Sequence, residues 1–148
     1  MKKSFLIINL LVGTCAFAQP KNESPETQKC VMDFALNASL PTSFPGIGEG
    51  SDPAGDRVYK NIMDKDTNIH HALSSFCVKN GNSTDAPTIP ETPEISKCVQ
   101  GFALEAALPI EFDSIDDPND IIGTEVYNRI MDRTTLTHRA LAVFCSVK

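Results

Sequence analysis

The chain has no tryptophan, and it has too few basic residues to balance its acids, with 13 lysines and arginines against 19 aspartates and glutamates. This deficit of positive charge argues against a nucleic-acid partner and against simple electrostatic binding to an anionic membrane. The sequence also lacks a Gly-X-Ser-X-Gly elbow, a phosphate-binding loop and a His-Glu-X-X-His helix. We therefore expect a protein that is not an enzyme and that carries no cofactor.

Long apolar runs are missing beyond the first residues. Lys2 and Lys3 precede an apolar run over 5–12, and small residues follow at the two positions that a signal peptidase reads, in the segment from Ala16 to Ala18. The run is too short to span a bilayer as a permanent helix. The sequence predicts a signal peptide over 1–18, a secreted protein exported through the periplasm, and no transmembrane segment in the mature chain.

The dominant feature of the sequence is a stretch that occurs twice. Residues 29–31, Lys-Cys-Val, return at 97–99, and one shift of about 68 residues maps nearly half of the following positions onto identical residues. This internal repeat predicts two units joined by a spacer. The predicted parts are a signal peptide (1–18), a flexible lead (19–27), unit 1 (28–80), a Pro/Thr-rich linker (81–95) and unit 2 (96–148).

Four cysteines remain when Cys15 of the predicted signal is set aside. In an exported chain an even number of cysteines is typical of disulfides, and four allow three pairings. The repeat favours Cys30–Cys77 together with Cys98–Cys145, because each unit then closes on itself in the same way. Each bridge would close a loop of about 48 residues and stabilise by about 4 kcal/mol through chain entropy.

Apolar residues recur with helical spacing in both units. They fall at i, i+3, i+4 and i+7 from Val31 and again from Val99, which predicts a helix over 25–40 and a matching helix in the second unit. Around Asp64 the chain either breaks into two helices or continues as one long helix over 53–78, and a break is favoured. The fold class is therefore all-α, with two tandem disulfide-closed helical units that either stand apart or pack as one bundle.

Two pairs of matched polar residues are candidates for a functional site. His70 and His138 occupy equivalent positions, and histidine is the side chain that titrates near neutral pH. Tyr59 and Tyr127 are matched in the same way and are candidates to line a binding groove. All four lie on predicted apolar helix faces, so a packing role is the simpler interpretation for each.

Basic residues gather on the later helices of both units, where a lipid headgroup or another anion could bind in spite of the net charge. A solvated helix surface is the simpler interpretation of these charges. The candidate binding residues are Tyr59, His70, Tyr127, Arg129, Arg133, His138 and Arg139. The acidic stretch from Asp113 to Asp120 departs from the EF-hand pattern, so a solvated loop is favoured over a calcium site and no metal is predicted.

Two resemblances follow from these residues. The spacing of Cys30 and Cys77, and of Cys98 and Cys145, in small exported helical units is similar to that of HdeA-type periplasmic acid-stress chaperones, although the duplication departs from that family. The whole chain resembles the small genus-restricted effectors that Gram-negative bacteria export by type II secretion. The second resemblance implies a secreted virulence factor with a protein or lipid-headgroup partner on a host, and the first implies a chaperone. The sequence leaves these functions, anion binding and the oligomeric state open.

Overall fold

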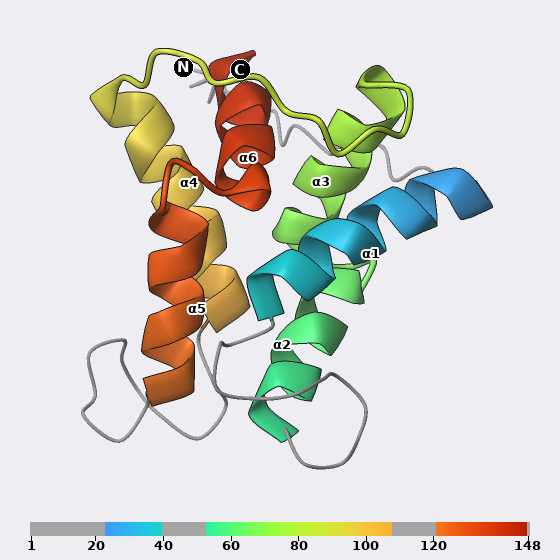
Figure 1. The fold of residues 1–148 in the computed structure, drawn as a ribbon, viewed down its shortest axis with the longest axis vertical. Helices are drawn as coiled ribbons and strands as arrows, with labels where there is room; N and C mark the ends of the chain where they lie inside the picture. The colour runs from blue at the N-terminus through green and yellow to red at the C-terminus, as the bar shows by residue number, and fades with distance from the viewer. Residues whose placement is uncertain (1–22, 40–52, 108–120, 148) are drawn as a thin grey trace, which may run out of the picture.

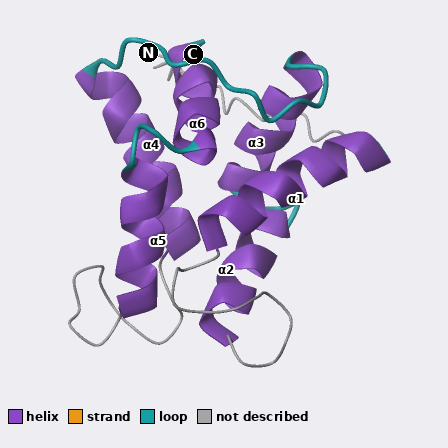
Figure 2. Cartoon of the chain, viewed as in Figure 1, coloured by secondary structure: helices purple, strands orange, loops and turns teal. Residues whose placement is uncertain are grey.

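The regular structure of this chain is helical. The computed structural model describes residues 23–39, 53–107 and 121–147, and these ranges contain six helices and no strand (Figure 1). Figure 2 shows the helices joined by loops and turns alone. The helices are α1 (Pro25–Ser39), α2 (Pro53–Met63), α3 (Asn68–Lys79), α4 (Pro93–Ala107), α5 (Ile121–Met131) and α6 (Leu136–Ser146). The predicted all-α fold is confirmed.

The break that the sequence favoured near Asp64 is present in both units. Helix α2 ends at Met63, and the next helix begins after Thr67, whose side-chain oxygen accepts the backbone N–H of His70 at 3.3 Å. Thr135 caps α6 in the same way. A threonine in this position satisfies one of the free N–H groups of the first helical turn, and this stabilises a new helix start over continuation of the old helix.

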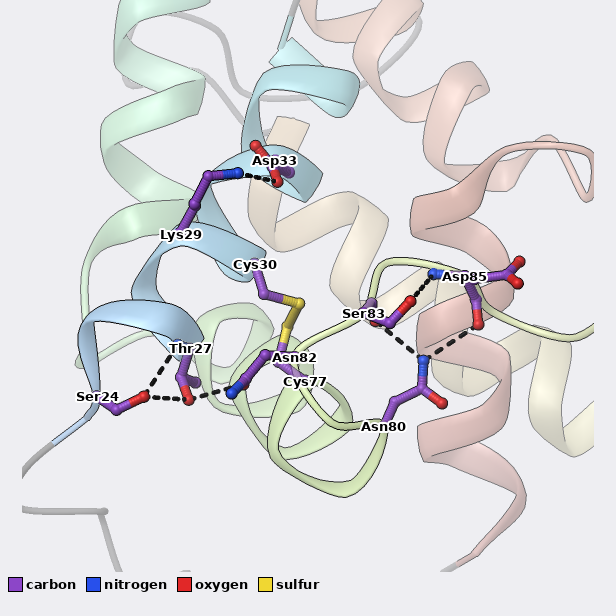
Figure 3. The surroundings of a disulfide bond; sticks show 10 residues. All are labelled: Ser24, Thr27, Lys29, Cys30, Asp33, Cys77, Asn80, Asn82, Ser83 and Asp85. Carbon is purple, nitrogen blue, oxygen red and sulfur yellow. Dashed lines mark hydrogen bonds and ion pairs between the residues drawn. A yellow bond between two sulfur atoms is a disulfide. The ribbon is translucent and has the colours of Figure 1, made fainter.

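Two disulfides close the units as predicted. Cys30 bonds to Cys77 and so joins α1 to α3, and Cys98 bonds to Cys145 and joins α4 to α6, with Cα atoms 6.1 Å apart in both bridges. Figure 3 shows the first bridge beside the turn that follows α3. Each bridge links the two ends of its unit in the unfolded chain as well. The unfolded chain therefore has less conformational entropy, and this stabilises the folded protein.

The core of each unit forms between the two disulfide-linked helices. Phe34 of α1 meets Phe76 of α3 edge to face with ring centroids 5.8 Å apart, and Phe102 meets Phe144 at 5.9 Å in the second unit. This edge-to-face arrangement is a favourable one for aromatic rings. The core is therefore built from the apolar positions that the sequence spacing predicted.

The two units pack against each other as one bundle, which settles the alternative that the sequence left open. Helix α3 packs against α6, α1 packs against α5 and α6, and α4 packs against α2 and α3. In Figure 1 helices α1 to α3 lie on the right of the view and α4 to α6 on the left. Each contact has a counterpart when the units are exchanged, which is the pattern of an approximate two-fold axis.

Polar contacts at the ends of α1 and α4 fix the two units in register. The carboxylate of Glu105 accepts the first backbone N–H groups of α3, from Asn68 at 3.0 Å and from Ile69 at 2.9 Å. At the counterpart position Asn37 accepts the hydroxyl of Thr137 at 3.3 Å. An acid of one unit thus caps a helix of the other, where the positive end of the helix dipole favours it.

The predicted linker also contributes to the core. Residues 83–92 form no helix and run from α3 to α4 (Figure 1). Ala86 is buried, and Ile89 is half-buried and packs on the core. Helix α4 starts at Pro93, inside the range predicted as linker. The segment therefore covers apolar surface as well as connecting the units.

The predicted signal peptide over 1–18 lies outside the described residues. Among the helices that the structure describes, none is both long and apolar enough to cross a membrane. The two disulfides are compatible with a secreted or extracellular protein, because such bonds persist in oxidising compartments.

Replacing Glu105 with Ala should lower the free energy of unfolding by about 1–2 kcal/mol, because the backbone N–H groups of Asn68 and Ile69 lose their acceptor while the Thr67 cap remains. Urea unfolding of the oxidised protein measures this loss. The control is Lys97→Ala on the exposed face of the same helix, expected within about 0.5 kcal/mol of the original chain. Equal unfolding free energies for the two variants would show that Glu105 does not hold the units together.

Candidate binding site

A buried glutamate stands just before the first helix of each unit. Ser24 and Thr92 cap α1 and α4, each accepting the backbone N–H three residues later, at 3.2 and 3.3 Å. A proline follows each cap at the first helical position, where a missing N–H costs nothing. These starts hold Glu23 and Glu91 in place, and their side chains are only 3% and 6% exposed. Burial of a carboxylate at this depth is costly unless a partner neutralises it.

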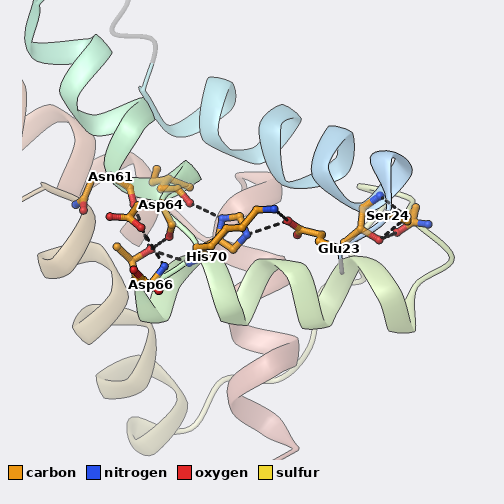
Figure 4. Close-up of polar contacts among 11 residues, drawn as sticks. Glu23, Ser24, Asn61, Asp64, Asp66 and His70 are labelled. Carbon is orange, nitrogen blue, oxygen red and sulfur yellow. Dashed lines mark hydrogen bonds and ion pairs between the residues drawn. The ribbon is translucent and has the colours of Figure 1, made fainter. Parts of the chain in front are cut away.

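In the first unit the partner is His70, which is 2% exposed (Figure 4). Its Nδ1 lies 3.0 Å from the backbone oxygen of Ile62, and its Nε2 lies 3.3 Å from Oε2 of Glu23. A carbonyl oxygen can only accept, so Nδ1 carries a hydrogen. The contact between Nε2 and the carboxylate then needs one further proton, which makes the pair an imidazolium and a carboxylate that share it.

The second unit repeats this arrangement with one difference. Nδ1 of His138 lies 2.8 Å from the backbone oxygen of Ile130, so it also carries a hydrogen. Its Nε2 lies 3.5 Å from Oε2 of Glu91 and forms no hydrogen bond with a described residue. The buried imidazole of the second unit therefore keeps one nitrogen open.

The basic residue beside each glutamate explains why the two histidines differ in their contact with the carboxylate. Nε of Arg133 lies 2.5 Å from Oε2 of Glu91, whereas Nζ of Lys65, at the matched position, lies 3.6 Å from Oε2 of Glu23. A guanidinium forms a short, directed bond with a carboxylate oxygen, and an ammonium acts more as a point charge. Arg133 thus occupies the oxygen that His138 would otherwise share.

A cavity of about 240 Å³ opens beside this group in the second unit. It is lined by 88–91 of the linker together with Arg133, His138, Arg139 and Ala142. Three buried polar atoms of these residues have no hydrogen-bond partner among the described residues: Oε1 of Glu91, Nε2 of His138 and Nε of Arg139. Buried polar groups are nearly always paired, so three unpartnered atoms among the residues that line one cavity are unusual.

Three of the residues predicted for binding therefore meet at one site, namely Arg133, His138 and Arg139. His70 lies in the equivalent pair of the first unit. Arg129 lies elsewhere, because its Nη1 donates to the backbone oxygen of Asn37 across the contact between the units, at 3.2 Å.

The two tyrosines do not line the cavity. Tyr59 and Tyr127 are half-buried and pack on the core, and the hydroxyl of Tyr127 accepts a hydrogen bond from Gln100 at 3.0 Å. They support the helices that carry the site.

Sequence reasoning missed the two glutamates. Glu23 and Glu91 lie 68 residues apart (91 − 23), in the same register as the repeat, but they precede the predicted unit boundaries at 28 and 96. Extending the comparison by a few residues toward the N-terminus would have found them, with the prolines at 25 and 93 beside them. Their polar surroundings resemble a flexible lead, which hides the signal.

No group of three or more histidines, cysteines and acids gathers within the described ranges in a way that would hold a metal ion. The acidic stretch from Asp113 to Asp120, considered as a calcium loop, lies outside the described residues. A search of protein-family models gives no match to the chain, and neither a curated protein nor a solved structure matches it significantly.

Three exposed carboxylates near the site have lowered pKa values. The backbone N–H and the hydroxyl of Thr134 donate to Asp132 and hold its pKa below the ordinary 3.8, and His138 lowers it further. Glu26 and Glu94, in the first turns of α1 and α4, have pKa values below 4.5 because their own backbone N–H groups and the capping hydroxyls of Ser24 and Thr92 bind the charged form. The stability that these groups contribute is present above their ordinary pKa values and is lost as pH falls through the lowered ones.

Replacing Thr134 with Ala should raise the pKa of Asp132 toward its ordinary value, because the hydroxyl that favours the carboxylate is gone. The rise should be partial, since the backbone N–H of residue 134 still donates. A carbon-13 NMR titration of the Asp132 carboxyl group measures the shift, with Thr134→Ser as the control that keeps the hydroxyl. An unchanged or lower pKa in the alanine variant would contradict this account of the turn.

Proposed function

We propose that this chain is an exported, non-enzymatic binding protein whose partner presents an anionic group to the cavity of the second unit. The observation that carries the proposal is the meeting of Arg133, His138 and Arg139 around that cavity, where the last two residues each have a buried nitrogen without a hydrogen-bond partner among the described residues. Such a protein fits a secreted effector that acts on an extracellular or host partner, either a protein or a lipid headgroup.

The local charge supports an anionic partner even though the chain is acidic as a whole. The wall holds two guanidinium groups and one carboxylate, that of Glu91, and His138 adds a further positive charge when it is protonated. The lining residues alone therefore carry a net charge of at least +1, and a further charge nearby is the exposed carboxylate of Asp132, whose pKa Thr134 and His138 lower. A local field of this kind attracts anions independently of the net charge of −6.

The placement of the other candidates supports a scaffold role for them. His70 is enclosed between a backbone carbonyl and Glu23, and the tyrosines pack on the core. The side chain of Arg133, by contrast, is 68% exposed, so a partner can reach it from solvent. Binding is thus best placed at the second unit, with the first unit as its structural counterpart.

The test is an NMR titration of the mature oxidised protein with acetate, phosphate or a soluble inositol phosphate at constant ionic strength. The Nε–H signals of Arg133 and Arg139 should shift saturably. The double variant Arg133→Gln/Arg139→Gln should weaken binding by roughly 10- to 100-fold, because each charged hydrogen bond contributes about 1.5 kcal/mol or more. The matched variant Lys65→Gln/His71→Gln of the first unit should retain affinity within about twofold. Anions that act no differently from chloride, or undiminished binding by the double variant, would refute the proposal.

The buried acid–imidazole pairs favour a second candidate function, an acid-stress chaperone. Acid-stress chaperones act at about pH 2 to 3, below the ordinary pKa of carboxylic acids, where a protein loses negative charge and keeps its positive charges. Loss of negative charge at the buried pairs would release the segments before α1 and α4 from the last helices of their units. The disulfides would keep the opened helices tethered.

This candidate function predicts that near pH 2.5 the oxidised protein loses its near-ultraviolet circular dichroism, keeps helical far-ultraviolet signal and suppresses aggregation of an acid-denatured enzyme. The double variant Glu23→Gln/Glu91→Gln should open at a higher pH, because an amide supplies no charge to begin with. A near-ultraviolet spectrum identical at pH 2.5 and pH 7, with no protection of the client, would exclude a chaperone function.

A further inference from the structure

Two residues that line the cavity of the second unit each carry a buried polar atom with no hydrogen-bond partner among the described residues. Oε1 of Glu91 is a buried carboxylate oxygen that needs a donor, and Nε of Arg139 is a buried donor that needs an acceptor. His138 also lines the cavity, and its Nε2 has no hydrogen-bond partner among the described residues. A ligand that satisfies this wall must therefore carry a donor and an acceptor close together, and a simple anion would satisfy only the arginine side.

The volume limits the ligand to a small molecule. An engineered protein cavity of about 150 Å³ binds benzene, which has six non-hydrogen atoms, so a cavity of about 240 Å³ has room for a somewhat larger molecule. A molecule with about eight to ten non-hydrogen atoms fits within the walls.

The rest of the wall is apolar. Ile89, Pro90 and Ala142 face the same space as the charged groups, so part of the ligand is hydrocarbon. The excess of positive charge selects an acid at the polar end. Because Arg133 already holds Oε2 of Glu91, the second carboxylate oxygen remains for a donor next to that acid.

We propose that this cavity binds a small carboxylic acid that has an amino or hydroxyl group beside the carboxylate and an apolar side chain, such as an amino acid or a 2-hydroxy acid. The carboxylate of the ligand binds Arg139 and the free guanidinium nitrogens of Arg133. Its amino or hydroxyl group donates to Oε1 of Glu91, and its hydrocarbon part lies on Ile89 and Ala142. This assignment rests on the proposed function, of which it names the ligand class.

The first unit provides an internal comparison. Among the described residues, Oε1 of Glu23 is unpartnered like Oε1 of Glu91. However, Nε2 of His70 is 3.3 Å from Oε2 of Glu23, and His71 stands where the second unit has Arg139. At these matched positions the first unit therefore lacks both the open imidazole nitrogen and the second guanidinium. One binding site per chain is therefore expected, in the second unit.

The experiment is isothermal titration of the mature oxidised protein with four probes that share a branched hydrocarbon part. L-leucine and 2-hydroxyisocaproate carry both groups, isocaproate lacks the donor, and isoamylamine lacks the acid. The first two should bind at one site per chain and at least tenfold more tightly than the other two, because a missing group leaves a buried partner unpaired.

Two variants test the two ends of the ligand separately. Arg139→Gln should weaken leucine binding at least tenfold, and His71→Gln, its counterpart in the first unit, should leave it unchanged. Glu91→Gln should weaken leucine more than 2-hydroxyisocaproate, because an ammonium loses a counter-charge and a hydroxyl does not. Circular dichroism confirms that each variant is folded, and if Glu91→Gln does not fold, the Arg139 and His71 variants decide the outcome.

The outcomes separate this inference from the proposed function. Equal binding of isocaproate and leucine would show a simple anion site, so the proposed function would stand and the ligand class would be wrong. If none of the four probes binds but inositol phosphate shifts the Arg133 and Arg139 signals, the proposed ligand class is wrong and the proposed function still stands. Failure of every probe, inorganic phosphate included, would overturn both.

Discussion

The contact on which this structure depends is the one between a buried glutamate and a buried histidine in each unit. Glu23 and Glu91 lie in the short segments before α1 and α4, and each faces an imidazole fixed by a backbone carbonyl. The carboxylate can stay buried only because a cation meets it. His70 meets Glu23 in the first unit and Arg133 meets Glu91 most closely in the second, so each glutamate ties a segment without helix onto its unit, close to the disulfide-linked core.

The two copies of this contact differ at one position, where the first unit has Lys65 and the second has Arg133. Lys65 leaves Glu23 to His70, and the first pair is closed. Arg133 holds Glu91 at 2.5 Å, and His138 is left with an open nitrogen beside a cavity. Two units that pack around an approximate two-fold axis thus differ in their polar contacts, because Glu23 accepts a hydrogen bond from His70 whereas Glu91 pairs most closely with Arg133.

Much of the scaffold could be predicted from sequence, and much of the site could not. The spacing of apolar residues from Val31 indicated α1, and the matched cysteines indicated the pairing, because both signals are local or repeated. The partners Glu23 and Glu91 lie in polar, proline-containing segments with no periodicity. The cavity arises only when 88–91 fold over α6, and this tertiary contact leaves no pattern in the sequence. Arg133 and Arg139 were found as basic residues, but their meeting with Glu91 required the structure.

The most direct measurement is nitrogen-15 NMR of the two imidazole rings in the oxidised protein and in the reciprocal variants Lys65→Arg and Arg133→Lys. The account predicts a bound Nε2 proton on His70, slow to exchange with solvent, and none on His138. It also predicts that Lys65→Arg removes this proton from His70 and that Arg133→Lys creates one on His138. The account is contradicted if the Nε2 protons of the two rings give the same signals and exchange rates in the original chain. It is also contradicted if these signals do not change in the Lys65→Arg and Arg133→Lys variants.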